Sequence, residues 1–164
     1  MSLKQHLVKQ LNLARGFTEQ LFQQFQSPQE WTTQVFPGAN HPLWVAGHLG
    51  FADNYALGLL APEQVEEPDG YRELFGMGSQ PQGDPGAYPP VEEVLGFARQ
   101  RRQALLEALQ GMEEEQLAQK LPEGAPEMLS TVADLFAFIA WHEGLHTGQV
   151  SVAHRSLGRK PLVG

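Results

Sequence analysis

Four stretches with helical periodicity constrain the fold more than any other feature of this sequence. In each stretch, apolar residues recur three or four positions apart, which is the spacing that places them on one side of a helix. No segment alternates apolar and polar residues convincingly enough to indicate a strand, and we find no internal repeat. The sequence therefore predicts an all-α fold with four long helices, over residues 2–26, 41–61, 90–112 and 129–157.

Prolines, a histidine and a glycine mark the expected helix ends. Pro28 ends the first helix, because the residue before a proline avoids the helical conformation. Pro42 suits the first turn of the second helix, and His41 before it is expected to help cap that helix. Gly158 is a plausible cap for the end of the fourth helix. The start of that helix is less well defined, because Ser130 is not followed three residues later by an acid.

The segment between residues 61 and 90 differs from the rest of the chain. It contains half of the 12 prolines, and a loop of this length inside a compact domain is often functional. We expect a short helix over residues 71–75, and we expect apolar side chains to pack the loop onto the long helices: Tyr71, Leu74, Phe75, Met77 and Tyr88. The predicted fold is a four-helix bundle with a long Pro/Gly-rich crossover between its second and third helices.

Length, charge and composition exclude several classes of protein. The 164 residues fit a single domain that spans positions 1–164. The absence of cysteine excludes disulfides, thiolate metal sites and a cysteine nucleophile. A net charge of −8 with scattered basic residues argues against nucleic acid as a partner. The sequence shows neither a secretory signal nor a run of ~20 apolar residues, so we expect no membrane association and a cytoplasmic location.

Two histidines lie on the apolar side of the fourth predicted helix. His142 and His146 are four residues apart, so one helical turn places their imidazoles on the same face as Leu135 and Ile139. An imidazole that points into an apolar interior is costly unless it is hydrogen-bonded or bound to a metal. Two interpretations follow: the pair is either a set of satisfied core histidines or part of a metal site.

A third histidine favours the metal site. His48 lies on the apolar side of the second helix, between Gly47 and Gly50. Gly144 and Gly148 accompany the histidines of the fourth helix. Small residues would let the two helices approach closely enough for their histidines to share one ion with nitrogen–metal bonds of ~2.0–2.1 Å. Three neutral imidazoles with an open fourth position are typical of a catalytic metal site. The sequence thus predicts that a divalent transition metal is bound by His48, His142 and His146.

The acidic residues near these histidines are weaker candidates. Residues 142–146 match the H-E-x-x-H pattern of zinc peptidases. However, Gln149 and Val152 stand where the extended pattern requires glycine and histidine, and no acid follows Glu143. Glu143 and Asp53 remain candidates for a catalytic base, although we expect Glu143 to face solvent or a partner helix instead. His6 and His154 are expected at the surface or rim.

The histidine motifs resemble those of a known family. A G-H-L context around His48, followed by H-x-x-x-H-x-G-Q from His142 to Gln149, resembles the DinB/YfiT-like superfamily of metal-binding four-helix bundles. The segments 74–79 and 88–90 are also similar to the subgroup that includes the N-terminal domain of ergothioneine-synthesising sulfoxide synthases. The resemblance covers essentially the whole chain.

This resemblance implies a cofactor, a chemistry and an assembly. It implies that His48, His142 and His146 hold zinc, nickel or iron, and that the protein forms a homodimer. Several members of the family are transferases or isomerases that depend on a low-molecular-weight thiol such as bacillithiol, mycothiol or glutathione. The sulfoxide synthases also need a second, C-terminal domain that these 164 residues do not include, so we do not expect that activity.

Three functional hypotheses follow from these observations. The first is a thiol-dependent transferase that acts on small electrophiles, with a small-molecule thiol as cosubstrate. The second is a metal-dependent hydrolase in which Glu143 or Asp53 activates water. The third is a non-catalytic binding module of the stress response that is stabilised by its metal.

Overall fold

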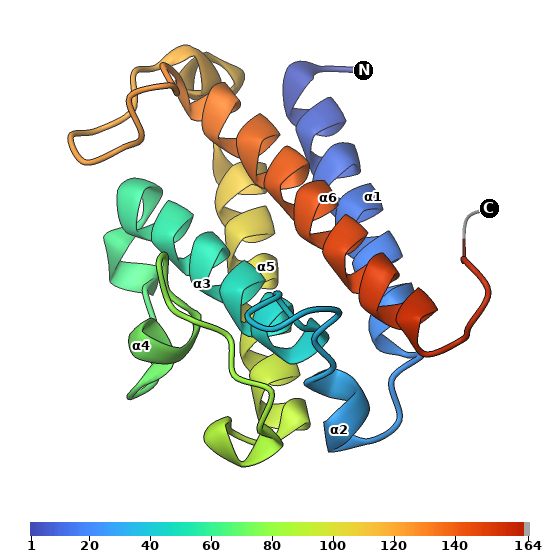
Figure 1. Ribbon diagram of the computed structural model, residues 1–164. Coiled ribbons are helices and arrows are strands. Elements are labelled where there is room, and N and C mark those ends of the chain that lie inside the picture. The colour runs from blue at the N-terminus through green and yellow to red at the C-terminus, as the bar shows by residue number, and fades with distance from the viewer. Residues whose placement is uncertain (163–164) are drawn as a thin grey trace.

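The computed structural model describes residues 1–162 and is all-helical (Figure 1), which confirms the predicted fold class. The long helices are α1 (Leu3–Phe22), α3 (Pro42–Leu60), α5 (Val91–Gly111) and α6 (Val132–Ser156). Shorter elements connect them: α2 (Pro28–Trp31), α4 (Tyr71–Phe75) and the 3₁₀ turns η1 (Pro62–Gln64), η2 (Pro85–Ala87) and η3 (Glu114–Ala118). Within residues 1–162 no strand forms, and one isolated bridge joins Lys120 to Thr131.

The long helices pack as two neighbouring pairs that share a core. Helix α1 lies beside α6, and α3 lies beside α5, as Figure 1 shows. Helix α3 also contacts α6, so that the two pairs meet across the interior. Two clusters of buried apolar residues fill the space, one around Trp44 and Phe75 and the other around Leu105 and Phe136. The contact between α3 and α6 is the part of the fold that brings the predicted histidines together.

Two helix starts follow the sequence prediction in part. His41 is the N-cap of α3, as predicted, and its Nδ1 accepts the backbone N–H of Trp44 at 3.1 Å. Helix α6 begins later than predicted, because Thr131 caps it. The Thr131 hydroxyl accepts the N–H of Asp134, whose carboxylate accepts the N–H of Thr131 at 2.8 Å. The capping box that Ser130 lacks is therefore present one residue later in the chain.

The first helix ends earlier than predicted, and a separate short helix follows it. Helix α1 ends at Phe22, and Ser27 then caps the separate short helix α2 by accepting the N–H of Glu30. The Ser-Pro pair favours the start of α2, because the serine side chain satisfies a free N–H while Pro28 occupies the first turn. The segment in between carries Phe25 into the core against Trp31.

The segment over residues 61–90 packs onto the long helices, as predicted. Tyr71 and Phe75 of α4 are buried, and Leu74 and Tyr88 pack against the same core cluster. Met77 was expected to join them, but its side chain is 91% exposed. Met77 follows the C-cap Gly76, where the chain leaves the core. In the described residues, no helix is both long and apolar enough to span a membrane.

Candidate metal centre

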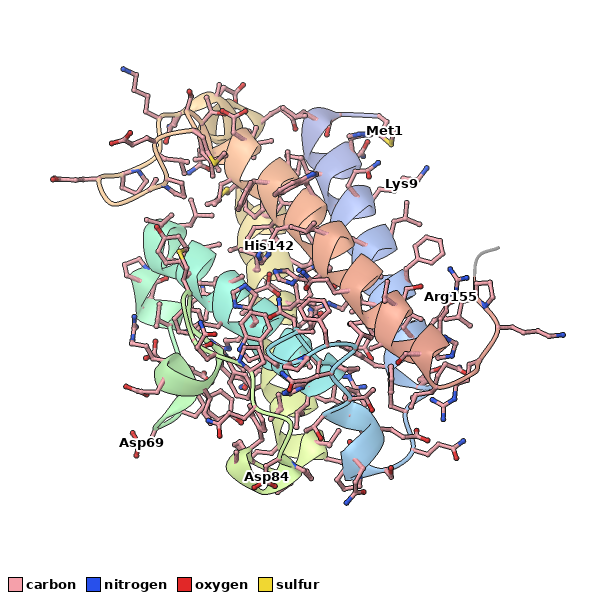
Figure 2. All side chains as sticks on the ribbon, viewed as in Figure 1. Met1, Lys9, Asp69, Asp84, His142 and Arg155 are labelled. Carbon is pink, nitrogen blue, oxygen red and sulfur yellow. The ribbon has the colours of Figure 1, made fainter. Side chains whose placement is uncertain are left out.

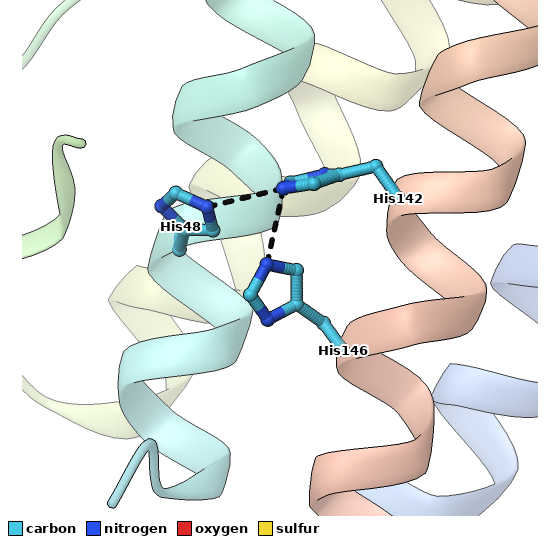
Figure 3. Close-up of side chains that lie close together, drawn as sticks. All are labelled: His48, His142 and His146. Carbon is cyan, nitrogen blue, oxygen red and sulfur yellow. Dashed lines mark hydrogen bonds between the residues drawn. The ribbon is translucent and has the colours of Figure 1, made fainter.

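The three histidines predicted from the sequence meet between α3 and α6 (Figure 3). His48 comes from α3, while His142 and His146 come from successive turns of α6. The Nε2 atom of His142 lies 3.3 Å from Nε2 of His48 and 3.0 Å from Nε2 of His146. Figure 2 shows His142 near the centre of the molecule, on the side of α6 that faces α3. The spacing of four thus places the imidazoles of His142 and His146 on the same face of α6, as predicted.

The distances between these nitrogens suit a single metal ion. A tetrahedral ion with bonds of ~2.0–2.1 Å holds its ligand atoms ~3.3 Å apart. The two Nε2–Nε2 distances are close to this value, and the ligand atoms of all three histidines lie within 4.8 Å of one another. The donor set is therefore compact enough to fit one divalent transition metal with a coordination position left over.

Hydrogen bonds on the far side of two rings set which nitrogen carries the proton. The Nδ1 of His48 lies 2.8 Å from the backbone oxygen of Phe75, which can only accept, so this Nδ1 donates its N–H. The Nδ1 of His146 lies 2.8 Å from Oε1 of Gln149 and donates in the same way. Both rings consequently turn the lone pair of Nε2 toward the site, which is the arrangement found in metal-ligating histidines.

Hydrogen bonds among the three histidines cannot satisfy all of their ring nitrogens. If His48 and His146 are protonated on Nδ1, His142 can donate at most one N–H to their two Nε2 lone pairs. At least one of these acceptors then lacks a partner among the three rings, and an acceptor without a partner costs about 1–3 kcal/mol where it is buried. A bound cation removes this cost for all three rings. The interpretation as satisfied core histidines therefore fits this geometry less well than a metal site does.

Burial keeps the three imidazoles neutral. It lowers the pKa of His142 to about 3, with the neighbouring His146 and His48 acting in the same direction. Burial likewise lowers the pKa of His146 to about 4 and lowers that of His48. Neutral imidazole is the form that binds metals, so the site is in its ligating state at neutral pH. The flat face of Trp44 stacks on His48 with the ring centres 4.5 Å apart, which restricts that ring further.

Comparison with known families agrees with the motifs. A family model described as the DinB superfamily matches residues 10–150, a span that contains all three histidines, the whole of α3 and α5, and the larger part of α1 and α6. The chain belongs to the DinB superfamily. No curated protein matches it. Proteins of this superfamily are metal-binding, which is consistent with the geometry of the histidine cluster in this chain.

In this DinB-superfamily chain, the two acidic candidates lie in a separate cluster of buried ion pairs. Glu143 contacts Arg15 and Arg102, each at 2.6 Å, and the contact with Arg102 is an ion pair without hydrogen-bond geometry. Asp53 receives two hydrogen bonds from Arg102, both at 2.9 Å, and one contact from Arg15 at 3.2 Å. These four residues come one each from the four long helices.

The charges of this cluster balance. Burial opposes the ionisation of Glu143, but Arg15 and Arg102 outweigh burial and hold its pKa below the usual value. The side chain of Glu143 is fully buried, so the expectation that it faces solvent is wrong, while the alternative that it faces partner helices is confirmed. Its two oxygens are each occupied by an arginine, as are those of Asp53.

The two arginines were not predicted from the sequence, although a signal was present. Arg102 falls on the apolar stripe of α5 together with Ala98 and Leu105, and Arg15 falls between Leu11 and Thr18 on the buried side of α1. An arginine at a position that the periodicity assigns to the core requires a buried carboxylate as partner. Applied to the sequence, this rule would have predicted that Glu143 and Asp53 are buried.

The glycines near the histidines have other roles than predicted. A side chain at Gly47 would come within 2.3 Å of the Phe75 ring, and one at Gly50 would meet the Phe97 ring at 2.8 Å. These glycines therefore admit α4 and α5, not α6. Gly144 and Gly148 have no atom within 4 Å of an added side chain. The prediction that they allow close helix approach is wrong, and they line an apolar groove of about 240 Å³ between α1 and α6.

The remaining histidines follow the prediction in part. His6 is exposed, as predicted. His154 is only 2% exposed, so its assignment to the surface or rim is wrong. The reason is that Phe25, in the segment after α1, packs edge-on against the His154 ring at 6.1 Å between ring centres. Neither residue contributes to the three-histidine cluster.

Proposed function

We propose that this protein binds one divalent transition metal ion through Nε2 of His48, His142 and His146 and acts as a thiol-dependent transferase on small electrophiles. The observation that carries the metal site is the convergence of the three Nε2 atoms, with the protons of two rings held on the opposite nitrogen. Zinc, nickel and iron all accept imidazole ligands and are the metals we propose.

The transferase proposal rests on the coordination position that three histidine ligands leave free on a metal ion. When bound, an ion held by three neutral imidazoles offers a further position to an external thiol and lowers the pKa of that thiol. The chain itself contains no cysteine, so no internal thiolate competes for this position. The low-molecular-weight thiol therefore enters as a cosubstrate, and its sulfur attacks the electrophile.

The hydrolase alternative has less support in the geometry. A hydrolase needs a base that can take a proton from water, but the carboxylates of Glu143 and Asp53 are buried and paired with Arg15 and Arg102. Their positions fit a structural role better than a catalytic one. The third hypothesis, a non-catalytic binding module, is distinguished from the transferase by a rate measurement.

The experiment measures the displacement of chloride from 1-chloro-2,4-dinitrobenzene by several thiols, in which an S–C bond forms, chloride leaves and the thiol proton passes to solvent. A free thiol with a pKa near 8.5 is about 3% thiolate at pH 7, so full ionisation on the metal raises the rate by up to about 30-fold. We expect this increase with metal-loaded protein and with a variant of the exposed His6, His6→Ala. A rate equal to that of His142→Ala for every thiol would leave the non-catalytic module as the better account.

We further propose that α1, α3, α5 and α6 form a four-helix bundle with residues 61–90 as its crossover, and that the chain is similar to the sulfoxide-synthase subgroup of the superfamily. The proximity of α4 to the site supports the second point, because the subgroup motif at 74–79 includes Phe75, whose backbone oxygen accepts from His48.

A homodimer remains a proposal from the family resemblance. Light scattering tests it, with twice 18.2 kDa as the expected mass.

A further inference from the structure

Asn40 connects a loop to the histidine site. It lies outside the helices, one residue before the N-cap of α3, and its Nδ2 donates to Oε1 of Gln149 on α6 at 3.0 Å. The same oxygen accepts the Nδ1–H of His146 at 2.8 Å. We propose that Asn40 and Gln149 are positioning residues that hold His146 in the tautomer with a free Nε2 lone pair. This inference rests on the proposed metal site.

The two amides can be arranged in only two self-consistent ways. In the first, Asn40 donates to the Gln149 oxygen, and that oxygen accepts from His146. In the second, both amides are turned over, so that the Gln149 NH₂ group donates to Asn40 and to Nδ1 of His146. His146 would then carry its proton on Nε2 and could not bind a metal there. The direction of this hydrogen-bond chain therefore decides whether His146 is a ligand.

The position of Asn40 is fixed from both sides. Gln34 donates to the backbone oxygens of Ala39 and Pro81, at 2.9 and 3.1 Å, and ties this loop to the segment over residues 61–90. On the other side, His41 is fully buried as the cap of α3. Asn40 thus stands on a backbone that does not depend on α6, which is what a positioning residue requires.

Of the Nδ1 hydrogen bonds of His48 and His146, only one can be changed by substituting its acceptor. The Nδ1 of His48 donates to a backbone oxygen, which every residue at position 75 would retain. The Nδ1 of His146 donates to a side chain, and that side chain is oriented by another. An isosteric substitution at Asn40 can therefore reverse the hydrogen-bond chain, and one at Gln149 can preserve its direction, without removing atoms from the core.

The test compares the affinities of isosteric variants for Zn²⁺ and Co²⁺ by competition with a chelator. In Asn40→Asp the new carboxylate can only accept, so it turns the Gln149 amide over and places the His146 proton on Nε2. We expect affinity to fall about 10- to 100-fold, the usual effect of losing an outer hydrogen bond to a ligand. A simple charge effect would act in the opposite direction, because an added carboxylate attracts a cation.

Two further variants complete the comparison. Gln149→Glu keeps an acceptor for both His146 and Asn40, so we expect its affinity to be equal to or tighter than that of the wild type. Asn12→Asp makes the same chemical change at an exposed position of α1 and should leave the affinity unchanged. If Asn40→Asp does not fold, Gln149→Met, which has no comparable acceptor, serves in its place and should also bind weakly. Wild-type affinity in Asn40→Asp, or in Gln149→Met, would overturn the inference.

A second readout is independent of metal binding. Long-range ¹⁵N–¹H correlation spectra of the metal-free protein report which nitrogen of each imidazole carries the proton. We expect the proton of His146 on Nδ1 in the wild type and in Gln149→Glu, and on Nε2 in Asn40→Asp. A wild type with these tautomers but no metal affinity would contradict the proposed function and leave the positioning pair intact. A wild type that binds metal, with the same His146 tautomer in every variant, would contradict the positioning pair alone.

Discussion

At the scale of single residues, neighbouring positions in α6 serve different purposes. His142 faces the other two histidines of the cluster, while Glu143, the next residue, pairs with two arginines in the core. The histidines could be predicted because a spacing of four places two imidazoles on one apolar face, and His48 lies on the apolar face of another helix. The pairing within the ion-pair cluster could not be predicted, because Arg15 and Arg102 are distant in sequence from Glu143, and periodicity indicates only that each arginine faces the core and needs a buried carboxylate.

The ion-pair cluster predicts a large effect on stability at Arg102. Arg102→Met leaves two buried carboxylates with one arginine, so we expect a loss of about 3–5 kcal/mol in the free energy of unfolding. Arg99→Met on the same helix removes an ion pair to Glu19 whose arginine side chain is half exposed, and should cost less than about 1 kcal/mol. Urea denaturation of the metal-free proteins measures both. Similar losses in the two variants would show that the cluster does not stabilise the fold as described.

At the scale of elements, α3 depends on the short helix α4. Phe75 closes over Gly47 and also supplies the backbone oxygen that orients His48. The sequence predicted both the helix over residues 71–75 and the importance of Gly47, but it assigned the glycine to the wrong neighbour. Periodicity shows which residues share a face, and it does not show which element packs against that face.

The surroundings of Gly47 and Gly144 predict opposite effects on stability when each glycine is replaced by alanine. Gly47→Ala places a methyl group against the fully buried Phe75, so α4 must move, and the acceptor of His48 moves with it. We expect a loss of about 1–3 kcal/mol in stability together with weaker metal binding. Gly144→Ala enters open space in α6 and should gain about 1 kcal/mol, with metal affinity unchanged. Thermal unfolding and chelator competition give the two quantities, and unchanged metal binding in Gly47→Ala would separate α4 from the site.

At the scale of the whole molecule, the three histidines come together because two helix pairs meet. The four long helices and the Pro/Gly-rich segment followed from the sequence, and the family model places residues 10–150 in the DinB superfamily. The pairing of α1 with α6 and of α3 with α5 did not follow, because each helix has an apolar stripe and the sequence pattern does not show which stripes pack together. A metal that bridges α3 and α6 binds the folded state alone and therefore stabilises it.

The central claim is that His48, His142 and His146 hold a metal ion, and metal analysis of the protein purified without chelators tests it most directly. The account predicts one divalent transition metal ion per chain in the wild type and in His6→Ala. It predicts almost none in a variant that combines His142→Ala with His146→Ala. A wild-type protein that carries no transition metal when zinc, nickel and iron are all supplied, or a double variant that retains the ion, would contradict it.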